Sequence, residues 1–352
     1  MTHYASNPDG SISHEERAFL EGRATNFSLF ITAATLVAAE GKAFVGQPEA
    51  ISDKDLPSLS EVAKIIQSQG AKAILQIHHG GKLSIPELLN GAAMVAPSED
   101  KVSGSRELAH SEIEDLIQAF ANAADLAIRS GFDGVEIHGA NGYLIQQFNS
   151  AQTNRREDAW GGTIEKRMRF SLAVVDAVNR VKQEYQCHDF IVGYRFSPEE
   201  AGENGLTMLE TFALIDALIE KPLQYLHVSL WDFYKKARRG ADTNMTRMQL
   251  IHERINGKLP LIGIGSLFSA NQILAAFQTG WAEFIAVGKA VMMNPDLATL
   301  ILENRESEIA LFIDPDKKDK YQIPEYLWQQ NMQRLSYLPP VINDEQWQTV
   351  DI

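Results

Sequence analysis

The sequence predicts an α/β protein built as a single (β/α)8 TIM barrel, with an incomplete first strand and a C-terminal extension. Short apolar segments typical of buried parallel strands alternate with longer amphipathic segments typical of helices along most of the 352 residues. Such alternation implies parallel strands joined by right-handed crossovers. Polar residues and glycines gather where several of these strands end, which is where parallel barrels carry their active sites.

Seven strands are expected in the interior of the chain: Leu29–Leu36, Ala73–Ile77, Gly134–Ile137, Phe190–Phe196, Tyr225–Val228, Leu261–Ile264 and Phe284–Val287. Met1–Tyr4 resembles the tail of an eighth strand, because an Asn-Pro-Asp-Gly turn follows it at once. A barrel closes by pairing its first strand with its last. We therefore expect a truncated or very short first strand, with the neighbouring strand edges exposed.

Helical periodicity separates these strands at residues 14–24, 58–69, 111–130, 164–185, 207–220, 244–256, 269–278 and 296–303. Capping boxes predict two helix starts, Ser111 with Glu114 and Thr207 with Glu210. The predicted barrel spans 1–303, and 304–352 form a C-terminal extension that packs on its outside or on a partner, which leaves a homo-oligomer open. The long insertion 79–110 is expected to cover the barrel mouth.

Composition limits the classes of partner. The chain is 45% hydrophobic and 22% charged, as in soluble globular proteins, and its formal net charge of -14 argues against nucleic acid as the main partner. No apolar run approaches the ~20 residues needed to span a bilayer, and no signal peptide is expected. A single cysteine, Cys187, fits a reducing compartment, so a cytoplasmic location is predicted.

The most informative stretch follows the strand at 134–137, where His138, Asn141 and Tyr143 lie within six consecutive positions. Imidazole and carboxamide groups can both donate hydrogen bonds to one carbonyl oxygen, and a phenol can supply a proton. A polar turn that only caps the strand explains any one of these residues alone. It explains the three together less well.

Further strand ends suggest a site for a flat ring. Gln76 and Arg195 offer an amide and a guanidinium to a heterocycle with several acceptors, and small residues at the first two strand ends, Thr2 and Ala34, let a ring lie close. An ion pair of Arg195 with Glu136 or Glu199 is the alternative interpretation.

The last two strands end in glycines, Gly263-Ile-Gly265 and Gly288-Lys289, where TIM barrels often bind phosphate. Either glycine pair alone is explained by a tight turn. The third glycine of a dinucleotide-binding fingerprint is missing, so a dinucleotide site is not expected. No set of residues has the spacing of metal ligands, and no Gly-x-Ser-x-Gly hydrolase motif is present.

Together these residues resemble the Old Yellow Enzyme family of FMN-dependent ene-reductases, in particular its bacterial NADH:flavin oxidoreductase branch, over residues 1 to about 303. The motifs that carry the resemblance are Met1-Thr-His-Tyr4, the Gln76 strand, Val135-Glu-Ile-His-Gly-Ala-Asn-Gly-Tyr143, Asn154-Arg-Arg-Glu-Asp158 with Gly161-Gly162, Val192-Gly-Tyr-Arg195 and Ile285-Ala-Val-Gly-Lys289.

The resemblance implies roles for individual residues. The isoalloxazine ring of FMN would contact Thr2, Ala34, Gln76 and Arg195, and its phosphate would contact Gly265, Gly288 and Lys289. His138 and Asn141 would hold the carbonyl oxygen of an enone or enal, Tyr143 would supply the proton, and Tyr4 would line the substrate side. NADH or NADPH would be the reductant, and no metal is implied.

The chain departs from the resembled family at its start, where relatives carry a few dozen more residues. If Met1 is the true start, weak FMN retention and poor stability are expected. The alternative function is accordingly a truncated, non-catalytic barrel with weak flavin binding. A phosphate-binding isomerase or aldolase is disfavoured because no catalytic base or Schiff-base lysine is evident at a strand end.

Overall fold

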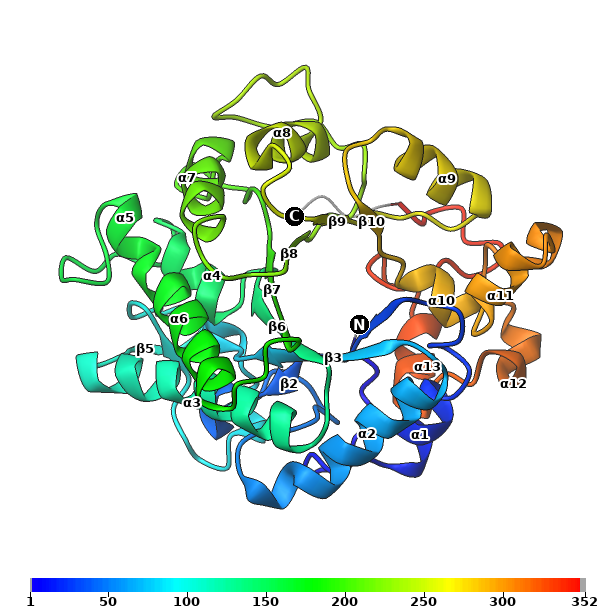
Figure 1. Cartoon of the computed structure of the whole chain (residues 1–352), viewed down its shortest axis with the longest axis horizontal. Helices are drawn as coiled ribbons and strands as arrows, with labels where there is room; N and C mark the ends of the chain where they lie inside the picture. The colour runs from blue at the N-terminus through cyan, green and yellow to red at the C-terminus, as the bar shows by residue number, and fades with distance from the viewer. Residues whose placement is uncertain (1, 349–352) are drawn as a thin grey trace.

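The computed structural model describes residues 2–348 and shows a curled sheet of parallel strands with helices around its outside (Figure 1). The hydrogen-bonded order is β1-β3-β6-β7-β8-β9-β10, and β2 also pairs with β3. The strands are β1 (Leu29–Ile31), β2 (Thr35–Leu36), β3 (Lys72–His78), β6 (Gly134–Gly139), β7 (Ile191–Phe196), β8 (Tyr225–Val228), β9 (Leu261–Gly263) and β10 (Phe284–Ile285). The predicted α/β barrel architecture is confirmed.

The predicted helices are present with shifted ends: α1 (His14–Leu20), α2 (Leu56–Ser68), α3 (His110–Arg129), α5 (Ile164–Arg167) with α6 (Arg169–Glu184), α7 (Met208–Leu218), α8 (Arg247–Ile255), α9 (Ala270–Gln278) and α11 (Leu297–Leu302). Four short helices were not predicted: α4 (Leu144–Asn149), α10 (Lys289–Met293), α12 (Lys318–Tyr321) and α13 (Glu325–Met332).

One of the two predicted capping boxes is wrong. Thr207 and Glu210 form theirs as expected at the start of α7. Helix α3, however, begins at His110, and the carboxylate of Glu112 accepts the N–H of Ala109 at 2.7 Å. The acidic residue whose carboxylate caps the start of α3 is therefore Glu112, two positions before the predicted Glu114.

The first strand differs from the prediction. Thr2–Tyr4 form no strand, and Met1 lies outside the described residues. The predicted strand 29–36 is two short strands, β1 and β2, both paired with β3. Within residues 2–348, β1 and β10 do not pair with each other, and Phe284 on β10 is 46% exposed. Helices α10 and α13 lie on this side of the ring (Figure 1).

Strand register brings the polar residues into adjacent rows. Gln76 on β3 is opposite Glu136 on β6, and His138 on β6 is opposite Arg195 on β7. Because side chains alternate along a strand, Glu136 and His138 share one side of β6 while Val135 and Ile137 face the helices. The apolar pair is fully buried in the main hydrophobic core. This alternation turns Glu136 and His138 away from the helices, toward the inside of the barrel.

The insertion after β3 carries a small parallel sheet of β4 (Val95–Ala96) and β5 (Arg106–Glu107). The buried Arg156 guanidinium binds the residues that follow the two strands of this sheet, donating to Pro97 O at 2.8 Å and Leu108 O at 2.7 Å. It also bonds the Asp158 carboxylate at 2.7 Å. Asn154 donates to Phe148 O and Trp160 O, so this motif fastens the insertion to the loop after β6.

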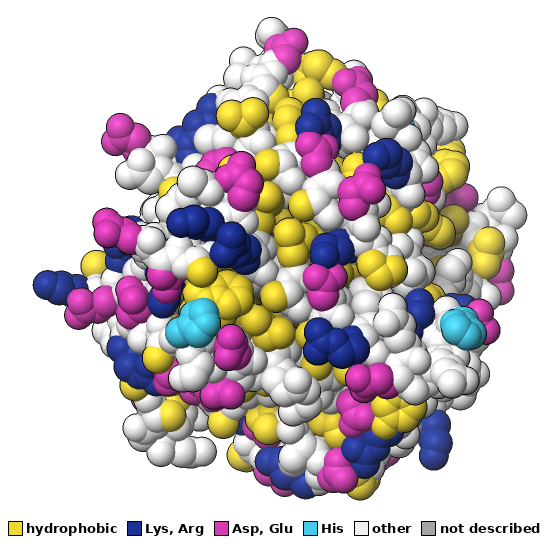
Figure 2. Space-filling view, turned by 60° about the vertical axis from the view of Figure 1, so that its left-hand side comes forward, with side chains coloured by type: hydrophobic (Ala, Val, Ile, Leu, Met, Phe, Trp, Pro, Cys, Tyr) yellow, Lys and Arg dark blue, Asp and Glu magenta, His cyan; other side chains and the backbone are white. Residues whose placement is uncertain are grey.

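The C-terminal extension packs against the rest of the chain through several buried apolar side chains. Ile313, Leu327, Leu338 and Val341 belong to the same hydrophobic core as the barrel strands. Among residues 2–348 no helix is both long and apolar enough to cross a membrane. On the face shown in Figure 2, acidic and basic side chains are interspersed.

Candidate active site

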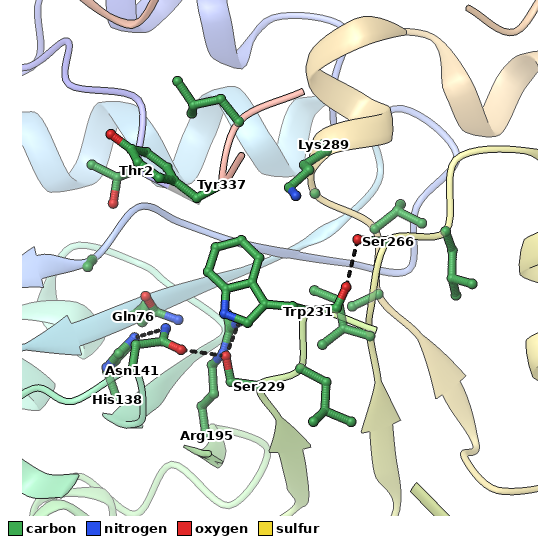
Figure 3. A pocket seen from close by; sticks show the side chains of 18 of the residues that line it. Thr2, Gln76, His138, Asn141, Arg195, Ser229, Trp231, Ser266, Lys289 and Tyr337 are labelled. Carbon is green, nitrogen blue, oxygen red and sulfur yellow. Dashed lines mark hydrogen bonds between the residues drawn. The ribbon is translucent and has the colours of Figure 1, made fainter. Parts of the chain in front are cut away.

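A cavity of about 440 Å³ opens at the carboxyl ends of the strands. Every site residue predicted from the sequence lines it except Gly265; these are Thr2, Tyr4, Ala34, Gln76, His138, Asn141, Tyr143, Arg195, Gly288 and Lys289. The cavity extends from Gln76 and His138 to Lys289 and Ser266, with Trp231 between these two ends (Figure 3).

Gly265 has a different position from the one predicted. A Cβ atom there would lie 2.2 Å from the backbone nitrogen of Phe233, so glycine is needed where the loops after β8 and β9 approach. The Phe233 N–H donates to Gly265 O at 3.3 Å. The pocket wall is formed by its neighbours Ile264 and Ser266 instead.

The turn after β6 brings His138, Asn141 and Tyr143 together. Asn141 has a φ of +58°, a left-handed conformation that asparagine tolerates better than most residues. Its Nδ2 lies 3.4 Å from His138 Nε2, and the rings of His138 and Tyr143 are 5.5 Å apart between centroids. Two nitrogen atoms and a phenol, from the end of β6 and the turn that follows it, therefore face the same cavity.

Sequence reasoning missed Ser229, which orients Asn141. Its Oγ donates to Asn141 Oδ1 at 2.7 Å and accepts from Arg195 Nη2 at 3.0 Å (Figure 3). Because the amide oxygen is held by Ser229, the amide nitrogen points toward His138. Ser229 directly follows the predicted strand Tyr225–Val228, and that position was the available signal.

Burial fixes the protonation states of the histidine and the tyrosine. Desolvation, aided by the charge of Arg195, lowers the pKa of His138 to about 3, so its imidazole is neutral at physiological pH. Desolvation raises the pKa of Tyr143, with smaller contributions from Tyr4 and Tyr337, so the phenol keeps its proton. The site thus presents neutral donors and a protonated acid.

Arg195 is partly buried beside this cluster. Its buried Nε has no hydrogen-bond partner among residues 2–348, and no carboxylate there lies within ion-pair distance. Glu199, one of the two predicted partners, pairs instead with Arg247 at 2.6 Å. A partly buried guanidinium with a free Nε donor suits an electron-rich ring that carries acceptor atoms.

Lys289 lies at the other end of the cavity. Its Nζ is 4.9 Å from the centroid of the Trp231 ring and 4.9 Å from that of Trp347, and it donates to Ser336 O at 3.3 Å. Desolvation lowers its pKa to about 8. A buried ammonium without a carboxylate partner in the described residues is suited to an anion such as a phosphate.

An aromatic wall closes the side of the cavity near Tyr143. Tyr4 packs on Phe44 at 5.9 Å, and Phe44 packs on Tyr143 at 5.8 Å between ring centroids. Tyr337 and Leu338 of the C-terminal extension complete the lining. Sequence reasoning gave no role to this extension, because nothing in its pattern shows that it returns to the barrel mouth.

These features fit flavin mononucleotide. The Arg195 Nε, which has no partner among residues 2–348, would suit the acceptor-rich edge of a flat ring. The amide oxygen of Gln76, whose nitrogen is bonded to Glu136, would suit its N–H edge, and Lys289 would suit a phosphate. The barrel and its pocket thus define a flavin-dependent oxidoreductase. The sequence profile of the NADH:flavin oxidoreductase / NADH oxidase family matches residues 1–308, and the chain belongs to this family. It is therefore an oxidoreductase with FMN as cofactor and NADH or NADPH as reductant.

Similar proteins agree with this assignment. The chain is 47% identical over 342 residues to a probable NADH-dependent flavin oxidoreductase of Bacillus subtilis, YqiG, covering 96% of this chain and 92% of the relative. It is 35% identical over 346 residues to the NADH:fumarate oxidoreductase of Klebsiella pneumoniae, covering 96% of this chain but 36% of that protein. Morphinone reductase in complex with tetrahydroNAD has a TM-score of 0.75 and 27% identity, covering 92% of this chain and 91% of the other.

Charge at position 289 gives a testable expectation for FMN binding. Lys289→Met should weaken FMN binding about 10- to 100-fold at pH 7, because a hydrogen bond to a charged group is lost. In the native protein the affinity should also fall as the pH rises above about 8, where the lysine loses its proton. Quenching of FMN fluorescence measures both effects.

Lys289→Arg is the matched control, because arginine stays charged across this range. Its FMN affinity should be flat where that of the native protein declines. The role of Lys289 is contradicted if the native protein and Lys289→Met show the same pH profile.

Proposed function

We propose that the protein reduces the C=C bond of α,β-unsaturated ketones and aldehydes with electrons from NADH. The supporting observation is the pair of nitrogen donors, His138 Nε2 and Asn141 Nδ2, 3.4 Å apart beside the protonated phenol of Tyr143. With Nε2 protonated, neither nitrogen can accept a hydrogen bond from the other. Both then need an acceptor supplied by a ligand, and one carbonyl oxygen can serve both.

The chemistry of the pair explains the reaction. FMN held by Gln76, Arg195 and Lys289 would supply the hydride transfer from NADH to the alkene. His138 and Asn141 donate to the carbonyl oxygen, where negative charge develops as the β-carbon is reduced, and donors already aimed at that oxygen stabilise the charge. Tyr143 gives its proton to the α-carbon, and a phenol that is fully protonated at working pH is always ready to do so.

Neutral donors favour a neutral carbonyl over a carboxylate. The relatives named as NADH:fumarate and NADH:acrylate oxidoreductases are named for alkenes conjugated to a carboxyl group, but the match covers only about a third of each. A carboxylate would bring its charge to a neutral imidazole and an amide, while the nearby Arg195 is already bonded to Ser229. Uncharged enones and enals suit this clamp better.

The test is anaerobic NADH oxidation by the FMN-loaded protein with 2-cyclohexenone, cyclohexanone or acrylate. We expect oxidation with the enone, one saturated ketone formed per NADH, no reaction with cyclohexanone, and slower turnover with acrylate. A loaded protein that is reduced by NADH but yields no ketone would contradict the proposal. Failure to retain FMN would favour the non-catalytic alternative.

A further inference from the structure

A fully buried carboxylate lies below the cavity and lines no part of it. Glu136 accepts hydrogen bonds from Gln76 Nε2 at 2.7 Å, His227 Nδ1 at 2.8 Å and Tyr225 Oη at 3.0 Å. These partners come from β3 and β8, on either side of β6 and β7. Three donors converge on a group that the reaction described above does not use.

The strands are shaped to allow this convergence. Tyr225 lies opposite Gly193 in the register of β7 and β8, and a Cβ at Gly193 would lie 2.1 Å from the tyrosine ring. Glycine there lets the ring cross β7 and bring its hydroxyl to Glu136. Gln76 reaches the same carboxylate directly, because the two residues are opposite each other in the β3–β6 register.

The carboxylate fixes the orientation of the Gln76 amide. An ionised carboxylate only accepts hydrogen bonds, so the atom of Gln76 facing it must be the nitrogen. Attraction and hydrogen bonding from His227, with the charge of Arg195, outweigh desolvation and keep the pKa of Glu136 below its ordinary value. The Gln76 oxygen is thereby left for the cavity, where it can accept from the imide N–H of a flavin ring.

The same charge acts on Arg195. Desolvation lowers the pKa of the Arg195 guanidinium, and attraction to Glu136 opposes this effect. A buried negative charge near the guanidinium also reduces the positive potential at the cavity. It therefore limits how strongly Arg195 favours an anionic, reduced ring over a neutral, oxidised one.

We propose that Glu136 is a positioning residue of the FMN site, which presents the Gln76 oxygen to the flavin and offsets the charge of Arg195. Its role is to set both the affinity for FMN and the relative affinities for the oxidised and reduced cofactor. The inference rests on FMN occupying the cavity and is independent of the alkene substrate proposed above. Both of its readouts are therefore taken without any alkene.

Glu136→Gln keeps the shape of the side chain but removes its charge. We expect FMN affinity, measured by fluorescence, to fall about tenfold, because the new amide can face Gln76 with either end. The ratio of affinities for reduced and oxidised FMN should rise about tenfold. That ratio corresponds to a midpoint potential about 30 mV more positive for a two-electron couple.

Glu136→Asp separates the two effects, since it keeps the charge but shortens the reach to Gln76. Its affinity should fall while its potential stays at the native value. Glu199→Gln is the matched control, because Glu199 is an equally buried carboxylate that bonds Arg247 and lies outside the cavity lining. It should change stability without changing the potential.

The proposal is overturned if folded Glu136→Gln, checked by its thermal midpoint, binds FMN with native affinity and potential. If Glu136→Gln does not fold, Glu136→Asp decides, and native FMN affinity in that variant overturns the proposal equally. A potential shifted by Glu199→Gln as much as by Glu136→Gln would likewise contradict a specific role. If the protein does not reduce enones, the FMN affinities and midpoint potentials can still be measured and still test this proposal.

Discussion

Tyr143→Phe should slow formation of saturated ketone about 10²- to 10⁴-fold while flavin reduction by NADH keeps its native rate. The substitution removes only the hydroxyl that protonates the α-carbon, and general acid catalysis contributes rate factors of this order. The raised pKa of Tyr143 means that the phenol is fully protonated at neutral pH, so the native rate should include the full contribution of general acid catalysis. Stopped-flow absorbance gives the NADH step, and product analysis gives the alkene step.

Tyr337→Phe is the matched control for this variant. Tyr337 also lines the cavity, but it comes from the C-terminal extension and not from the segment that carries His138, Asn141 and Tyr143. It should leave ketone formation within a few-fold of native. Equal losses in both steps of Tyr143→Phe would indicate a damaged pocket and would refute the proton-donor role.

Removing the oxygen clamp should have an effect of similar size. His138→Ala or Asn141→Ala should each lower the rate of enone reduction about 10²- to 10³-fold, as expected when one donor to a developing oxyanion is lost. His138→Asn keeps a neutral N–H donor near the same place and should recover part of the rate. Enone-dependent kcat/KM measured with saturating NADH gives these values.

Ser229→Ala tests the orientation of the clamp without removing a donor. The Asn141 amide loses the partner of its oxygen, so we expect a smaller loss in the rate of enone reduction, about tenfold. The clamp is contradicted if His138→Ala and Asn141→Ala reduce enones as fast as the native protein.

The barrel and most of its site were predictable because short-range patterns decide them. Apolar strand segments that end in polar residues, such as 134–143, can be recognised from the sequence alone. The parallel topology then brings those ends together. The left-handed Asn141 and the glycine that follows it also agree with the turn expected there. Local pattern and global fold pointed to the same place.

The parts that failed depend on distant contacts. The strand at 29–36 is broken around Thr32, whose Oγ accepts the backbone N–H of Gln76 at 3.0 Å, a contact that sequence alone does not reveal. The close packing of Gly265 against Phe233, which keeps it out of the cavity lining, also depends on a distant segment. Tyr337 and the network around Glu136 likewise depend on segments that meet only in the folded chain.

Short helices were missed for a related reason. α4 and α10 have six and five residues, too few for a periodic pattern to emerge, and α4 is buried all round. The start of α3 was misplaced because its N-cap residue, Ala109, has no capping side chain, so Glu112 alone marks the position. Pattern reasoning finds long amphipathic helices better than such pieces.

A single-turnover experiment tests the central claim most directly. The FMN-loaded protein is reduced with one equivalent of NADH without oxygen and is then mixed with 2-cyclohexenone. We expect the absorbance of oxidised flavin to return at a rate that saturates with enone concentration, with one equivalent of cyclohexanone formed. A flavin that stays reduced in the presence of excess enone would contradict it.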